Sequence, residues 1–228
     1  MLGDSIEYAK DAVWGKWVRW ILLVISTIIF PLILGYMMEV YRGKKPAPDL
    51  EHWGKLFIDG LKLLVAGLIY AIPVIIILIV FIGGSIMSVM PLLQGNPDYM
   101  VTNPDAFMGA LAGILVGILI AIIVGFIIGL ISTIGMVRLA RTDKFGEAFN
   151  FGAILTTIRT IGWGTYIIAL IVLFIVAFIF ALILNIIMAI PFIGWLIYLF
   201  LLPLLILFEA RFITLIYESA GEGPVTQI

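Results

Sequence analysis

The sequence predicts an all-α fold: a polytopic bundle of transmembrane helices with interfacial amphipathic helices, forming one membrane domain over residues 1–228. The first observation is composition, since 64% of the residues are apolar and only 12% are charged. Soluble domains average about 45–50% apolar and about 25% charged residues. The second is five apolar runs that each approach or exceed the about 20 residues of a spanning helix. The third is that no run alternates apolar and polar residues as barrel strands do. We therefore expect a multi-pass protein of the cell membrane.

The amino-terminal part divides into residues 4–17 and residues 18–41. The first range carries Ile6 and Trp17 on one helical stripe beside charged residues, which is typical of an interfacial amphipathic helix. The second range is mainly apolar and contains Pro31. It is predicted either as a single span or as a hairpin bent near that proline.

Residues 51–60 form a second amphipathic helix, which leads into a span over residues 61–90. The amphipathic stretch shows a ladder of charges at helical spacing, which consists of Glu51, Lys55, Asp59 and Lys62. Residues 91–106 then form an external loop. The span that follows, over residues 107–137, is rich in glycine.

The carboxy-terminal half begins with a cytoplasmic amphipathic segment over residues 138–160. Two more apolar runs, over residues 164–190 and 193–217, are predicted spans joined by a tight link near Pro191. An internal repeat is a further hypothesis, because Gly35 to Arg42 and its basic loop resemble the segment from Gly135 to Arg141. Two apolar segments can also resemble each other through composition alone.

The connections between the runs differ in charge. Lys and Arg gather in residues 42–62 and 138–160, and residues 91–106 contain none. By the positive-inside rule the basic segments are cytoplasmic and the loop without Lys or Arg is external. If residues 18–41 span once, Lys10, Lys16 and Arg19 lie outside; if they form a hairpin, all 13 basic residues lie inside.

The third run carries a ridge of small residues at every fourth position. Glycine allows helix backbones to approach closely, and close packing drives helix association in lipid. The ridge is therefore predicted to contact another helix, either within the monomer or in a homo-oligomer. Its members are Gly109, Gly113, Gly117, Ala121, Gly125 and Gly129.

Charged residues near the predicted span ends are candidates for pairing or for lipid contact. Arg138 is expected to pair with Glu39 or Glu209, and Arg211 needs a partner of its own. Arg138, Arg141 and Lys144 are also candidates for contact with anionic headgroups. Interfacial anchoring explains the same residues without a binding site.

The stretch from Trp53-Gly54 through Phe57 to Asp59-Gly60-Leu61-Lys62, together with Leu34-Gly35-Tyr36, resembles an uncharacterised family of prokaryotic, largely archaeal, membrane proteins. The family is known only as domain of unknown function number four thousand and thirteen. The resemblance implies a membrane fold and covers most of the chain. It implies no activity, ligand or catalytic residue.

No set of residues predicts a reaction. The chain has no cysteine and a single histidine, His52, which is expected to be solvated or to lie at the headgroup level. No nucleophile with its base, metal cluster or phosphate cradle is evident, so we predict no catalytic, metal-binding or cofactor-binding residue. Membrane lipids and a homo-oligomer or membrane complex are the expected partners, and nucleic acid is not.

Three functional hypotheses follow. The first is a non-enzymatic membrane scaffold, assembly subunit or passive pore. The second is a small-molecule transporter or lipid-handling protein, which requires a hydrated cavity lined by polar groups. The third is a lipid-modifying membrane enzyme, because such enzymes place polar residues at the membrane surface.

Overall fold

The computed structural model describes residues 1–95 and 98–221, and the regular elements in this part of the chain are helices. The expected all-α fold is therefore confirmed. In chain order the elements are α1 (Leu2–Val13), α2 (Trp17–Ile28), α3 (Phe30–Tyr41), α4 (Trp53–Ser88), α5 (Met90–Leu93), α6 (Tyr99–Thr102), α7 (Pro104–Thr142), η1 (Phe145–Phe149), α8 (Phe151–Ile161), α9 (Trp163–Met188) and α10 (Gly194–Glu218).

Four of these helices are long and apolar enough to cross a membrane: α4, α7, α9 and α10. They correspond to four of the five predicted runs, and they identify the chain as an integral membrane protein. The amphipathic stretch expected at 51–60 and the span expected at 61–90 form one continuous helix, α4. Pro73 lies inside this helix.

The fifth run, residues 18–41, is divided into α2 and α3. Each has 12 residues, and the chain leaves helical geometry at Ile29, directly before a helix with Pro31 in its first turn. Proline favours that position because the first-turn N–H groups have no partner inside the helix. At about 1.5 Å per residue, 12 residues extend about 18 Å, which is short of the about 30 Å hydrocarbon layer. Neither helix can span the layer alone.

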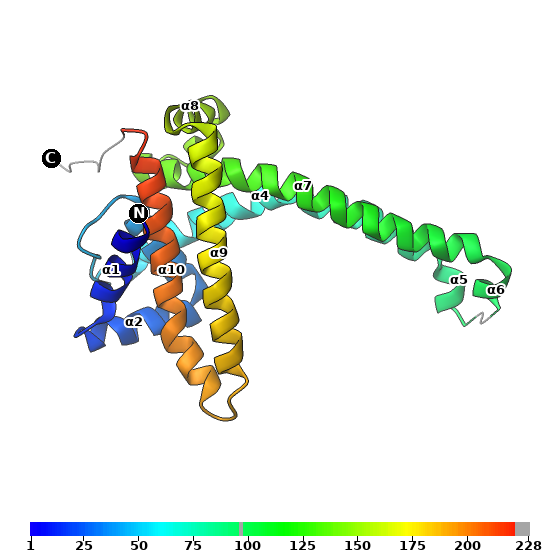
Figure 1. Cartoon of the computed structure of the whole chain (residues 1–228), viewed down its shortest axis with the longest axis horizontal. Helices are drawn as coiled ribbons and strands as arrows, with labels where there is room; N and C mark the ends of the chain where they lie inside the picture. The colour runs from blue at the N-terminus through cyan, green and yellow to red at the C-terminus, as the bar shows by residue number, and fades with distance from the viewer. Residues whose placement is uncertain (96–97, 222–228) are drawn as a thin grey trace. The chain divides into compact units, whose positions relative to one another are not determined.

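The chain forms two compact units, which are described separately. The first comprises residues 1–66 and 131–228, and the second comprises residues 67–130. In the first unit α9 and α10 run side by side, and α1 and α2 lie beside α10 (Figure 1). Leu23, Met38 and Leu207, from α2, α3 and α10, are fully buried. This unit therefore has its own packed core.

The beginning of α4 crosses α3 with almost no space between the two backbones. A Cβ atom added to Gly35 would overlap the carbonyl of Leu56, and one added to Gly60 would overlap the carbonyl of Pro31. Glycine removes the side chain that would hold the helices apart. These two glycines therefore determine how closely α3 and α4 pack, and they bring the end of α3 near the charges of α4.

The predicted segment 138–160 contains the end of α7, the short 3-10 helix η1 and α8. Asn150 caps α8, since its side-chain oxygen accepts a hydrogen bond from the N–H of Ala153 at 3.2 Å. Ile154 and Ile158 lie on the buried face of α8. This helix therefore has one buried apolar face.

Candidate functional site: a charged cluster at the ends of α3 and α7

Arginines stand at the carboxy-terminal ends of α3 and α7. Arg42 follows α3 directly, and Arg141 lies in the last turn of α7. The last carbonyls of a helix lack partners within the helix and carry partial negative charge. A cation at this position is therefore favourable, and it can donate hydrogen bonds to those carbonyls.

Each arginine reaches the end of the other helix. Arg42 Nε donates to the carbonyl of Ala140 at 3.2 Å, and Arg141 Nε donates to the carbonyl of Tyr41 at 2.6 Å. The side chains of Arg42 and Arg141 are only 12% and 4% exposed. The ends of α3 and α7 are thus joined by two reciprocal, largely buried hydrogen bonds.

Arg42 also contacts three carboxylates. Its Nη1 lies 2.5 Å from Glu39, and its Nη2 lies 2.8 Å from Asp59 and 3.7 Å from Asp143. Glu39 and Asp59 are buried. A buried charge is costly unless it is paired and hydrogen-bonded, so Arg42 compensates the charges of two helices at once.

Lys62 connects the cluster to the turn after α7. Its Nζ lies 2.8 Å from Asp143 and 3.3 Å from Asp59. The hydrogen bond from Lys62 is the main cause that lowers the pKa of Asp143, and partial burial opposes the shift. Asp143 also has a positive φ of 53°, a conformation that Asp and Asn tolerate better than most residues.

A second group of ion pairs attaches α1 and the end of α10. Arg211 Nε lies 2.9 Å from Asp4, and Arg141 Nη2 lies 2.6 Å from Glu218. Lys45 contacts Asp4 at 2.8 Å. A hydrogen bond from Lys45 lowers the pKa of Asp4, burial opposes this shift, and Arg211 adds to it. The amino-terminal helix is therefore held to α10 by charge as well as by packing.

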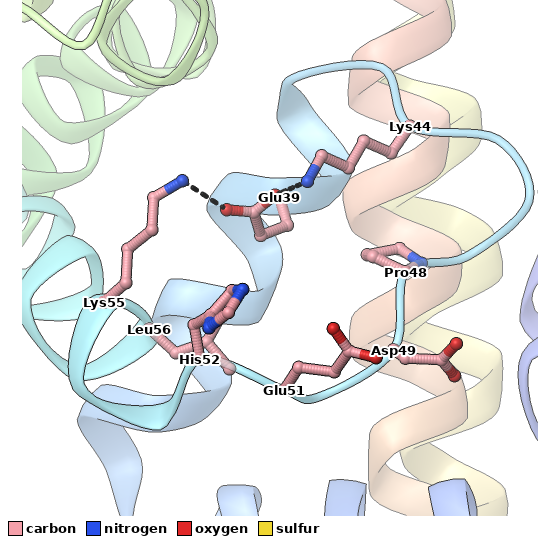
Figure 2. Close-up of a pocket in the computed structure, with 8 residues that line it drawn as sticks. All are labelled: Glu39, Lys44, Pro48, Asp49, Glu51, His52, Lys55 and Leu56. Atoms are coloured by element: carbon pink, nitrogen blue, oxygen red, sulfur yellow. Dashed lines mark ion pairs between the residues drawn. The ribbon is translucent and has the colours of Figure 1, made fainter.

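Beside the cluster lies a polar pocket of 260 Å³ (Figure 2). Glu39 lies in its wall between two lysines, with Lys44 Nζ at 2.5 Å and Lys55 Nζ at 3.5 Å. His52 projects toward Glu39 from the segment before α4 (Figure 2). Charges of both signs line this space: Glu39, Lys44, Asp49, Glu51, His52 and Lys55, together with Pro48 and Leu56.

Arg138 has a partner other than the two expected from the sequence. Arg138 pairs with Glu147 at 2.5 Å, and neither Glu39 nor Glu209 is its partner. Glu209 makes no ion pair within residues 1–95 and 98–221. The 3-10 helix η1 turns the chain back toward α7, which brings Glu147 to Arg138, and sequence spacing alone does not show that turn.

The proposed headgroup residues are not gathered at one point. Arg138 and Arg141 have separate carboxylate partners, whereas Lys144 is exposed. Arg42 and Asp59, which organise the cluster, were not among the candidate residues. Arg42 directly after an apolar helix and Asp59 in the charge ladder were signals that could have indicated them.

The glycine ridge of α7 has different surroundings along its length. A Cβ on Gly113 would lie 2.6 Å from Ser85 Oγ, and one on Gly117 would overlap the ring of Phe81. At Gly125 the nearest atom is an ordinary 3.8 Å away, and at Gly109 nothing lies within 4 Å. A Cβ added to Gly129 would also have no neighbouring side chain within 4 Å. Ala121 is buried. The middle of the ridge thus packs on α4 within the second unit.

Residues 1–95 and 98–221 contain no group of three or more His, Cys, Asp or Glu side chains placed to hold a metal ion. His52 lines the polar pocket among lysines and carboxylates, and the residue is exposed (Figure 2). The site is therefore a cluster of ion pairs with adjoining cavities.

A family model described as "Protein of unknown function (DUF4013)" matches residues 20–189, which is more than half of the chain. The match begins within α2, includes α3 and the charged part of α4, and ends near the end of α9. No curated protein matches the chain. No solved structure matches it.

Proposed function

This chain belongs to the DUF4013 family, and we propose that it is a non-enzymatic scaffold of the cell membrane that assembles with other copies of itself. The charged cluster holds the helix ends together on one side of the membrane. The long helices present apolar surfaces for assembly.

This proposal rests mainly on the low burial of the long helices within the chain. In α9 only 11% of the most apolar 18-residue stretch is buried, and in α4 and α7 the share is 17%. For α10, at the centre of the first unit, it is 44%. Such surfaces contact either lipid or other helices.

Small residues on these surfaces indicate that other helices, and not only lipid, contact them. Gly83 and Gly84 on α4, and Gly109 on α7, have no atom within 4 Å of an added Cβ. Small residues in membrane helices typically mark close helix contacts. In this proposal they are positions where another copy packs.

The pairing within the charged cluster also supports a structural role. Its cations pair with carboxylates of other helices or of the turn after α7: Arg42 with Asp59, Lys62 with Asp143, Arg141 with Glu218, and Arg211 with Asp4. A transporter uses such groups to bind and release a solute, whereas here they connect helices. We place this side in the cytoplasm, because residues 42–62 and 138–160 carry many of the Lys and Arg residues.

Single cysteines test the assembly directly, since the chain has none of its own. We expect Gly109→Cys to cross-link between copies in native membranes, with Gly54→Cys, in the charged part of α4, as the control that does not. Light scattering of the purified protein should show more than one subunit. A monomer without cross-links that also passes small solutes into liposomes would overturn the proposal in favour of a transporter.

A further inference from the structure

A second cavity, of 360 Å³, lies between the ends of α3 and α7 and the start of α4. It is separate from the pocket of mixed charge, although Lys44 and Lys55 line both. Four of its lining side chains are cations and one is a carboxylate: Arg42, Lys44, Lys55 and Arg141 against Asp143.

The cations around this cavity outnumber the carboxylates that compensate them. Arg42, Lys44 and Lys55 all share the single carboxylate of Glu39, at 2.5, 2.5 and 3.5 Å. Asp59 and Asp143 add two negative charges, but Lys62 takes part in pairing with both. Arg141 pairs with Glu218, outside this group. The other three lining cations and Lys62 make four cations that share the three carboxylates Glu39, Asp59 and Asp143, so this group carries one more positive than negative charge.

Lys44 and Lys55 carry the most accessible positive charges at this cavity. Their side chains are 42% and 53% exposed, whereas Arg42 and Arg141 are largely buried and oriented by their hydrogen bonds. Lys44 and Lys55 approach Glu39 from opposite sides (Figure 2). Both side chains also line the cavity, so their ammonium groups lie within reach of a ligand bound there.

The backbone at Gly43, in the loop after α3, lies close to the guanidinium of Arg141. Gly43 has a positive φ of 84°, and an added Cβ would lie 2.7 Å from Arg141 Nη2. A residue with a side chain would therefore be strained and would also displace the guanidinium. The result is a pair of buried, hydrogen-bonded guanidinium groups beside two exposed ammonium groups.

We propose that this cavity binds a phosphate group, presented either by an anionic lipid headgroup or by a soluble phosphate compound. Lys44 and Lys55 contact the phosphate oxygens, and Arg42 and Arg141 hold the positively charged wall. Charged hydrogen bonds from Lys and Arg are the usual means by which proteins recognise phosphate. The site needs no assembly between copies, so it stands apart from the scaffold proposal.

Thermal unfolding in detergent, with inorganic phosphate added against chloride at equal ionic strength, tests binding. Phosphate should raise the unfolding temperature of the parent, because a ligand that binds only the folded state stabilises it. The double variant Lys44→Gln/Lys55→Gln should need about tenfold more phosphate or show no shift, since the two lysines supply the most accessible positive charges. Lys44→Arg should retain the response.

Lys45→Gln is the matched control, because Lys45 is adjacent in sequence and equally charged but contacts Asp4 and does not line the cavity. It should respond to phosphate as the parent does. Each variant is first melted without phosphate, so that a loss of folding is distinguished from a loss of binding.

Nanodiscs of phosphatidylcholine, with or without phosphatidylglycerol, identify the source of the phosphate. Stabilisation by phosphatidylglycerol that depends on Lys44 and Lys55 assigns the site to a lipid headgroup. Stabilisation by inorganic phosphate alone assigns it to a soluble compound. A parent protein that responds to neither, or a Lys45→Gln variant that loses the response equally, would overturn the proposal.

Discussion

Arg42 and Arg141 each donate a hydrogen bond to the carbonyl of the residue that precedes the other in the sequence, Arg42 to Ala140 and Arg141 to Tyr41. The partners of the first bond are 98 positions apart and those of the second are 100 apart. Such reciprocity is what a parallel internal repeat of Gly35–Arg42 and Gly135–Arg141 would produce. The repeat itself stays a prediction.

Replacing either arginine by lysine tests this connection, because lysine keeps the charge but has one nitrogen. The single ammonium nitrogen cannot reproduce the separate contacts of Nε, Nη1 and Nη2, so we expect Arg42→Lys to lower the free energy of unfolding by about 1.5–3 kcal/mol. Denaturant unfolding in detergent measures it. The double variant Arg42→Lys/Arg141→Lys should lose less than the sum of the single losses, since the two bonds join the same helix ends.

Arg159→Lys is the control for this exchange. Arg159 is exposed on α8, so its replacement should change the unfolding free energy by less than about 0.5 kcal/mol. If Arg42→Lys were as mild as Arg159→Lys, the reciprocal bonds would contribute nothing to stability.

Alanine at Gly35 or Gly60 should separate α3 from α4. The added Cβ meets a backbone carbonyl, which cannot rotate away as a side chain can, so the loss should reach or exceed the about 1–3 kcal/mol typical of overpacking. Gly54 lies on α4 with open space around it, and Gly54→Ala should be neutral or slightly stabilising. Equal unfolding temperatures for all three variants would contradict the close crossing.

Leucine at Gly117 should destabilise the protein by overlap with Phe81 on α4, again by about 1–3 kcal/mol. Gly109→Leu meets no neighbouring atom within the chain, so it should leave the stability of the monomer nearly unchanged. Ile120→Leu and Ile127→Leu conserve volume and should be almost silent. The measurement is thermal unfolding in detergent, with light scattering to follow subunit number.

Asp143→Asn should remove a pH-dependent part of the stability. The pKa of Asp143 is lowered in the folded protein, so its contribution is present above the ordinary aspartate pKa of about 4 and is lost as pH falls through the lower folded pKa. Because this side chain is largely exposed, the effect should be only about 0.5 kcal/mol. Asparagine also tolerates the positive φ. We therefore expect the parent and Asp143→Asn to differ in free energy of unfolding at pH 7, and this difference should narrow toward pH 3.

The amino terminus should lie on the same side of the membrane as the basic loop after α3. Arg19 pairs with Asp49, and Tyr8 donates to the carbonyl of Lys44 at 3.1 Å, so α1 and the first turn of α2 contact that loop. Cysteines at Lys16 and Lys45 should both resist an impermeant thiol reagent in intact cells, whereas a cysteine at Gln94 should react. Labelling at Lys16 together with Gln94 would show that residues 18–41 span the membrane once.

Composition and segment length were sufficient to predict the membrane class, the helical fold and four long apolar helices. These properties depend on summed transfer free energies and on the thickness of the bilayer, which any apolar run of about 20 residues satisfies regardless of its neighbours. The resemblance at residues 53–62 was likewise readable from the sequence, and the family match confirms it.

Tertiary structure alone decided which charges meet. Arg42 contacts Asp59 and Ala140. Arg138 pairs with Glu147 and not with Glu39 or Glu209. The loops and the crossing at Gly35 and Gly60 set these distances, and sequence separation does not encode them. The division of residues 18–41 at Ile29 has the same origin. A break near a proline is readable from the sequence, but the anchoring of both halves on α10, by Trp20 to Phe200 and Thr214 to Val40, depends on contacts between segments more than 170 positions apart.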